Sequence, residues 1–130
     1  MRYYINTPEY RIIVPGKPES FRTRRSGEYK RKVQHAARQL FSHPLKGPVR
    51  VIIDYFHVRK RRMDMDNVSK CILDALNGLA YADDRQVGLH KGTDHDLRQW
   101  VSLSDSVDLI KPLAEHDEYV IVRIRKKRQA

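Results

Sequence analysis

The chain has 130 residues and a formal net charge of +10 at pH 7, with 26 lysines and arginines against 16 acidic residues. Residues 1–130 are expected to form a single domain with one hydrophobic core. An excess of positive charge on this scale favours a polyanionic partner, most commonly nucleic acid. The single cysteine excludes an internal disulfide and fits a cytoplasmic protein, and no apolar run is long enough for a membrane span or a signal peptide.

A short strand is predicted at residues 10–14, where β-branched and aromatic side chains gather. Pro15 ends it, and a basic loop with interleaved aromatic residues follows. Guanidinium and ammonium groups in such a loop suit phosphates, and aromatic rings suit unstacked bases. The residues predicted to bind DNA here are Lys17, Arg22, Arg24, Arg25 and Lys30. The alternative interpretation is a solvated loop that binds nothing.

The apolar spacing over residues 28–41 predicts an amphipathic helix. Its buried stripe would be Tyr29, Val33, Ala36, Ala37 and Leu40. The outer face is basic and either follows a DNA backbone or is simply solvated. Residues 49–58 predict a strand that is apolar on both faces, which is typical of a central position in a sheet. Asp54 on that strand is interpreted as an edge or surface carboxylate, with a further metal ligand as the alternative.

The central motif joins a basic run to a group of carboxylates. Arg61 and Arg62 belong to the basic run and are also predicted to bind DNA. They lead into Asp64-Met65-Asp66-Asn67, in which Asp66 or Asn67 is expected to cap a helix. That helix would bury Val68, Cys71, Ile72, Ala75, Leu76 and Leu79, and Gly78 would end it.

The carboxylates are crowded for a basic protein. Lys70 falls one helical turn after Asp66, and Asp83 and Asp84 follow the helix. Carboxylates repel one another unless a cation or a basic group lies among them, and Mg²⁺ prefers such oxygen ligands together with waters and a phosphate. The motif therefore favours a magnesium site beside DNA, provided that tertiary folding returns Asp84 to Asp64. Each aspartate taken alone is as readily a helix cap or a solvated turn residue.

The C-terminal third carries weaker signals. A short strand is predicted at residues 86–90, and the alternation of residues 119–125 predicts another. Residues 99–103 suggest a strand and residues 107–113 a helical turn. The triplet at residues 94–96 is interpreted as solvated, with metal coordination as the alternative, and the remaining histidines have no spacing typical of a zinc site. The basic tail at residues 126–128 is expected to lie outside the fold and to add attraction for phosphates.

Three segments, in order, resemble the signature of the RusA family of Holliday junction resolvases: residues 64–70, 74–78 and 83–87. The upstream basic loop is similar to that of the family, so the resemblance covers roughly residues 14–87. It implies that Asp64, Asp66 and Asp84 are the metal-binding catalytic carboxylates and that Lys70 is the catalytic lysine. Asp83 is set aside, because the family's functional weight rests on the second member of the pair. Residues 92–118 do not align with the family pattern.

The resemblance also implies a fold, an activity and an assembly. The fold would be α+β, with one mixed β-sheet flanked by two main helices. The activity would be Mg²⁺-dependent resolution of Holliday junctions by paired phosphodiester hydrolysis, in DNA recombination and repair. No organic cofactor and no association with a membrane are expected. A homodimer would place one acidic site against each of two equivalent strands. Trp100 and Leu103 are apolar positions that would suit its interface.

Two other functions stay open on the sequence. A nuclease acting on other branched DNA would use the same residues, but a restriction-enzyme type of site is not evident because no lysine follows Asp84 at the required spacing. A non-catalytic DNA-binding protein would explain the charge and would leave the acidic group without a role.

Overall fold

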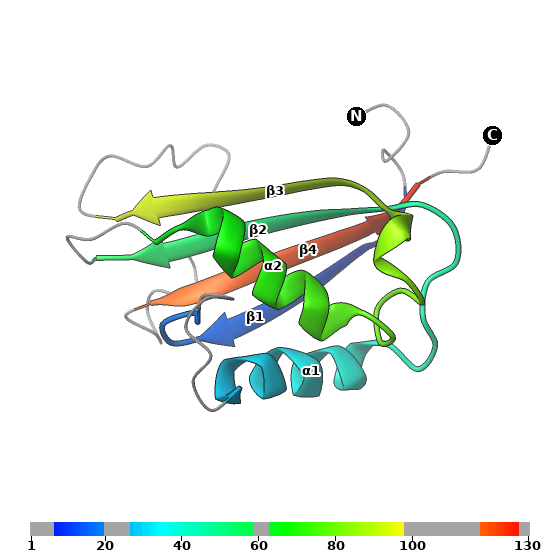
Figure 1. Ribbon diagram of the computed structural model, residues 1–130, viewed down its shortest axis with the longest axis horizontal. Helices are drawn as coiled ribbons and strands as arrows, with labels where there is room; N and C mark the ends of the chain where they lie inside the picture. Colours follow the sequence, from blue (N-terminus) through cyan, green and yellow to red (C-terminus); the bar gives the residue numbers. More distant parts are fainter. Residues whose placement is uncertain (1–6, 20–26, 59–62, 98–117, 128–130) are drawn as a thin grey trace.

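The computed structural model describes residues 7–19, 27–58, 63–97 and 118–127. In this part of the chain, one four-stranded sheet carries two α-helices (Figure 1). The elements are β1 (Glu9–Pro15), α1 (Glu28–Leu40), β2 (Val49–His57), α2 (Met65–Leu76), the 3-10 helix η2 (Asp84–Gln86), β3 (Val87–Asp96) and β4 (Tyr119–Lys126). The predicted α+β class, with a mixed sheet and two main helices, is confirmed.

The sheet has the strand order β1-β4-β2-β3. The last strand, β4, lies between β1 and β2 and runs antiparallel to both. The pair β2 and β3 is parallel, and α2 forms the crossover that parallel neighbours need. The prediction that residues 49–58 form a central strand is therefore confirmed, whereas β3 and β1 are the edges.

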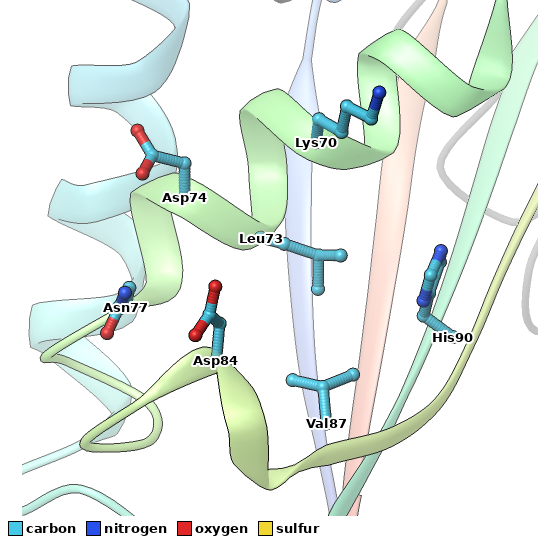
Figure 2. Close-up of a pocket in the computed structure, with 7 residues that line it drawn as sticks. All are labelled: Lys70, Leu73, Asp74, Asn77, Asp84, Val87 and His90. Carbon is cyan, nitrogen blue, oxygen red and sulfur yellow. The ribbon is translucent and has the colours of Figure 1, made fainter.

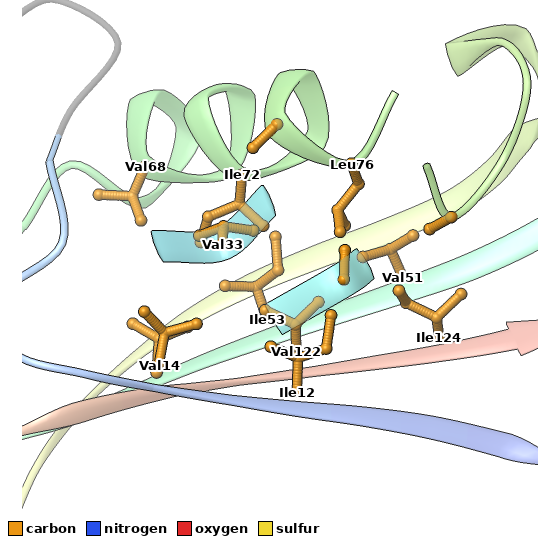
Figure 3. Close-up of a cluster of buried hydrophobic side chains, with 14 of the residues drawn as sticks. Ile12, Val14, Val33, Val51, Ile53, Val68, Ile72, Leu76, Val122 and Ile124 are labelled. Carbon is orange, nitrogen blue, oxygen red and sulfur yellow. The ribbon is translucent and has the colours of Figure 1, made fainter. Parts of the chain in front are cut away.

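Both helices cover the same face of the sheet. Alternate residues of β2 and β4, such as Ile53 and Val122, pack with Val33 of α1 and with Ile72 and Leu76 of α2 in one buried cluster (Figure 3). These side chains have no exposed surface. The predicted apolar stripes of the two helices are thus largely confirmed, although Leu40 at the end of α1 is 40% exposed.

The opposite face of the sheet carries a smaller buried cluster of Phe56, Tyr119 and Ile121. Asp54 faces the same side, because side chains alternate along a strand. It is 6% exposed; its Oδ1 lies 2.7 Å from His95 Nε2, and its Oδ2 accepts a hydrogen bond of 3.0 Å from Arg123. The interpretation of Asp54 as an edge or surface carboxylate is wrong, because β2 is central and its neighbours supply the partners.

The edge strand β3 is longer than the sequence predicted. It continues to Asp96, so the triplet Asp94-His95-Asp96 is not a solvated segment. Similarly, Lys126 ends β4 and the Lys127 N–H donates to Pro48 O at 2.7 Å, so these two tail residues belong to the fold.

Several predictions lie outside the described residues: the strand at 99–103, the helical turn at 107–113, and the interface positions Trp100 and Leu103. Within the described ranges, no helix is long and apolar enough to span a bilayer.

Candidate active site

Asp64 is the N-cap of α2. Its Oδ1 accepts from the backbone N–H groups of Asp66 at 3.2 Å and Asn67 at 3.4 Å, and its Oδ2 accepts from Asn67 Nδ2 at 2.5 Å. The prediction of Asp66 or Asn67 as the cap is wrong, because the helix already begins at Met65. Asp66 lies in the first turn, where the helix dipole favours a negative charge.

A buried pair from β2 and β3 holds the segment that leads into α2. Asp94 Oδ2 accepts from the Met63 backbone N–H at 2.9 Å, and Asp94 Oδ1 lies 2.5 Å from Nε2 of His57. The His57 side chain is fully buried and that of Asp94 is 8% exposed. Because Met63 immediately precedes Asp64, this pair fixes where the helix cap lies relative to the sheet.

Gly92 of β3 allows α2 to approach the sheet closely. A Cβ atom at this position would lie 2.4 Å from Ser69 Oγ and 3.4 Å from the backbone oxygen of Met65. A side chain at this position would therefore require the Ser69 hydroxyl to turn away or α2 to move away from β3. Gly92 and Asp94 together set the position of the Asp64 end of the site.

The second acidic segment is a single turn of 3-10 helix, η2. Asp83 caps it: Asp83 Oδ1 accepts from the Arg85 N–H at 2.9 Å, and Oδ2 lies 3.1 Å from the Arg85 guanidinium. The backbone and side-chain hydrogen bonds from Arg85 lower the pKa of Asp83 to about 2. The pKa of Asp84 is raised above its usual value by the hydrogen bond with the Asp83 carboxyl, by desolvation and by the Asp83 charge.

Asp84 faces α2 across a pocket of about 370 Å³. The α2 side contributes Lys70, Leu73, Asp74 and Asn77, and the η2–β3 side contributes Asp84, Val87 and His90. Figure 2 shows Asp84 and His90 rising toward the helix, with Leu73 and Val87 between them. The structure thus brings Lys70 and Asp84, which are far apart in the sequence, to one pocket.

Asp64 and Asp66 do not line this pocket. Asp66, Lys70 and Asp74 recur every four residues and therefore share one face of α2. Four residues of helix rise ~6 Å, so Asp66 stands about one turn beyond Lys70. Within the described ranges, no three Asp, Glu, His or Cys side chains are close enough to hold a metal as they stand.

The carboxylates of these two acidic segments nevertheless fit a hard cation chemically. Asp64, Asp66 and Asp84 are exposed and offer carboxylate oxygens, which are the ligands that Mg²⁺ prefers. Lys70 is also exposed, and it lines the same pocket as Asp84. Mg²⁺ also keeps several of its waters, so two or three carboxylates on facing elements are a suitable donor set.

The family model of the endodeoxyribonuclease RusA matches residues 8–93. The chain belongs to the RusA family. The match runs from β1 into β3 and includes both acidic segments and the pocket between them. A comparison with curated proteins finds no match. As a member of the RusA family, the protein is an enzyme that hydrolyses DNA, a Holliday junction resolvase. The family expected from the motifs is confirmed.

The predicted DNA-binding residues of this RusA-family enzyme are only partly described. Lys17 follows the end of β1 and is exposed. Lys30 on α1 is paired with Asp74 on α2, with Nζ and Oδ2 2.5 Å apart, so its charge is shared with a pocket residue. Five others lie outside the described residues: Arg22, Arg24, Arg25, Arg61 and Arg62.

Four residues around the site of this RusA-family enzyme are not predicted from the sequence. His90 lines the pocket, His57 and Asp94 hold the approach to Asp64, and Gln86 completes a capping box with Asp83. Only Gln86 had a local signal, because a capping box places Gln three residues after the cap. The other three depend on how β2, β3 and α2 pair in space.

Proposed function

We propose that this RusA-family enzyme resolves four-way DNA junctions by Mg²⁺-dependent hydrolysis at the face formed by α2 and η2. Lys70 and Asp84, the proposed catalytic lysine and one proposed metal ligand, line one pocket. This juxtaposition is the observation that carries the proposal, because no local sequence pattern requires it. Asp66 and Asp64, the other proposed ligands, continue the same helix toward its N-terminus.

Each residue has a distinct part in the proposed reaction. Asp66 and Asp84 would hold Mg²⁺ from facing elements, and Asp64, whose orientation is fixed by the helix cap, would complete the protein ligands. When bound, magnesium supplies an activated water and offsets charge on the phosphorane. Lys70 would bind a non-bridging phosphate oxygen and stabilise the charge that develops there in the transition state.

Substrate binding would rest on phosphate contacts more than on base edges. The net charge of +10 supports this, and the proposed contact residues are Lys17, Arg22, Arg24, Arg25, Lys30, Arg61 and Arg62. Cleaving both equivalent strands of one junction requires two sites related by twofold symmetry, so we propose a homodimer.

The test is cleavage of a supercoiled plasmid that extrudes a cruciform, beside a synthetic four-way junction and a linear duplex of the same sequence. Paired cleavage yields linear plasmid, whereas a single nick relaxes the plasmid and removes the cruciform. We expect linear product and cut junction with Mg²⁺, and neither with Ca²⁺ or without metal. Binding of the junction without cutting in Mg²⁺ would refute the proposal and favour a DNA-binding protein without catalysis.

A further inference from the structure

We infer that Gln86 is a positioning residue that fixes Asp84 against α2. The inference rests on the proposed function, because it gives Asp84 a part in metal binding. Gln86 ends η2, two residues after Asp84, and neither the motif nor the family match assigns it a role.

The side chain of Gln86 uses all of its hydrogen-bonding capacity at one junction of the fold. Its Oε1 accepts from the backbone N–H groups of Ala82 at 2.9 Å and Asp83 at 3.0 Å. Its Nε2 donates to the backbone oxygens of Leu45 and Gly47, both at 2.9 Å. One amide thus joins the turn that carries Asp84 to the loop between α1 and β2.

That loop is itself fixed to the segment that follows α2. The Leu45 N–H donates to Ala80 O at 2.8 Å, and Leu45 pairs with Tyr81 in an isolated parallel bridge. The Tyr81 hydroxyl donates to Leu73 O at 2.6 Å, and Leu73 lines the pocket that Asp84 faces. Gln86 therefore connects Asp84 to a fixed framework that includes the opposite wall of the pocket.

Core packing does not hold η2 in place. None of its three residues is buried, and both Asp84 and Arg85 are exposed. A short 3-10 turn has poor hydrogen-bond geometry of its own. The position of the Asp84 carboxylate relative to Lys70 consequently depends on the Asp83 cap, on the four hydrogen bonds of Gln86, and on the flanking residues Tyr81 and Val87, which pack in or against the core.

Only a side chain of this length with both donors and an acceptor makes these bonds. Glutamate has the same shape but would set a carboxylate oxygen against the Leu45 and Gly47 carbonyls. Groups that orient metal ligands typically change metal affinity or activity by ~10–100-fold when they are replaced. Gln86→Glu keeps the two bonds that Oε1 accepts and replaces the two bonds that Nε2 donates with repulsion between oxygens. We therefore expect this variant to need an Mg²⁺ concentration about tenfold or more higher.

The experiment compares Gln86→Glu and Gln86→Met with the wild type and with Gln39→Glu. Gln39 is exposed near the end of α1, so the control makes the same charge change away from the pocket. Amide hydrogen exchange of residues 82–87 is measured first, without metal or DNA, followed by calorimetric binding of Mg²⁺. Cleavage of a four-way junction is then measured over a range of Mg²⁺ concentrations.

For both Gln86 variants we expect faster exchange at residues 82–87, weaker Mg²⁺ binding, and a half-maximal Mg²⁺ concentration raised by about tenfold or more. High Mg²⁺ should restore their cutting, and the control should match the wild type throughout. A Gln86→Met enzyme with wild-type exchange and wild-type Mg²⁺ dependence would overturn the inference. If the wild type itself does not cut the junction, the proposed function fails instead. The amide hydrogen exchange of residues 82–87 alone then tests whether Gln86 holds η2 in place.

Discussion

The pair His57–Asp94 makes a sharp prediction about stability. Replacing Asp94 with alanine removes the acceptor of the Met63 N–H and a partner of His57 Nε2. A buried donor left unpaired costs about 1–3 kcal/mol. His57 is fully buried and Met63 half-buried, so the His57 cost should lie toward the upper end of that range and the Met63 cost toward the lower end.

We therefore expect Asp94→Ala to lower the free energy of unfolding by about 3 kcal/mol in total. For a domain of this size, that loss corresponds to a fall in Tm of ~10 °C. The control is Asp74→Ala, which removes an ion pair in which both side chains are at least 41% exposed. Exposed pairs contribute about 0–1 kcal/mol, so the control should change stability far less.

Urea denaturation of the two variants, followed by circular dichroism, measures these differences. Adding His57→Ala and the double variant gives the coupling between the two side chains, which we expect at about 1 kcal/mol or more. An Asp94→Ala protein within about 0.5 kcal/mol of the wild type, the range of ordinary surface substitutions, would refute the assignment of this pair as the anchor of the segment before Asp64.

Three further predictions follow from the described contacts. Gly92→Ala should lower the free energy of unfolding by about 1–3 kcal/mol, because its Cβ would lie 2.4 Å from Ser69 Oγ. Adding Ser69→Ala should recover part of that stability, and thermal melts that show no recovery would exclude this contact as the cause. Burial by itself would raise the pKa of Asp54, but hydrogen bonds and charges from His95 and Arg123 outweigh burial and lower that pKa. The stabilisation from Asp54 is therefore present above the unfolded pKa of about 4 and is lost as the pH falls through the folded value. Asp54→Asn should flatten the acid limb of a plot of stability against pH, and an unchanged limb would contradict this. Lys17→Ala should reduce the slope of log affinity for a junction against log salt by ~0.9 for each phosphate that Lys17 neutralises, and an unchanged slope would remove Lys17 from the interface.

The regular elements could be predicted because their signals are local. The helix α1 and the strand β4 each show one clean period in their apolar residues, and both were placed within one residue of their observed ends. The start of α2 was harder, because Asp64, Asp66 and Asn67 are all good caps and only the backbone decides among them. In the structure the cap is Asp64, because its Oδ1 accepts a hydrogen bond from the backbone N–H of Asp66.

The buried polar residues could not be predicted, because their partners are distant in the sequence. Asp54 is paired with a residue of β3 and a residue of β4, and Asp94 with a residue of β2. Nothing in the triplet at residues 94–96 reveals that the parallel register places Asp94 beside Tyr55 and His95 beside Phe56. From the sequence alone a polar triplet is interpreted as solvent-facing, although this one lies on a strand that runs beside the most buried strand of the sheet.

The candidate site lies between these two cases. The spacing of Asp64, Asp66, Lys70 and Asp84 carried the family resemblance, and the family is confirmed. The sequence did not reveal that η2 and α2 face each other across a pocket, nor that Gln86 and Tyr81 tie the two walls together. Those features need the loop between α1 and β2, which carries no part of the motif.

The central claim is that Asp84, rather than its neighbour, completes the metal site against α2. The most direct test is cleavage of a four-way junction in Mg²⁺ by Asp84→Asn and Asp83→Asn, with junction binding measured in Ca²⁺. Asparagine is as good a helix cap as aspartate, so Asp83→Asn should keep the turn and most of the activity. We predict that Asp84→Asn binds the junction at least as tightly as the wild type and does not cut it; cutting by Asp84→Asn at the wild-type rate would contradict the account.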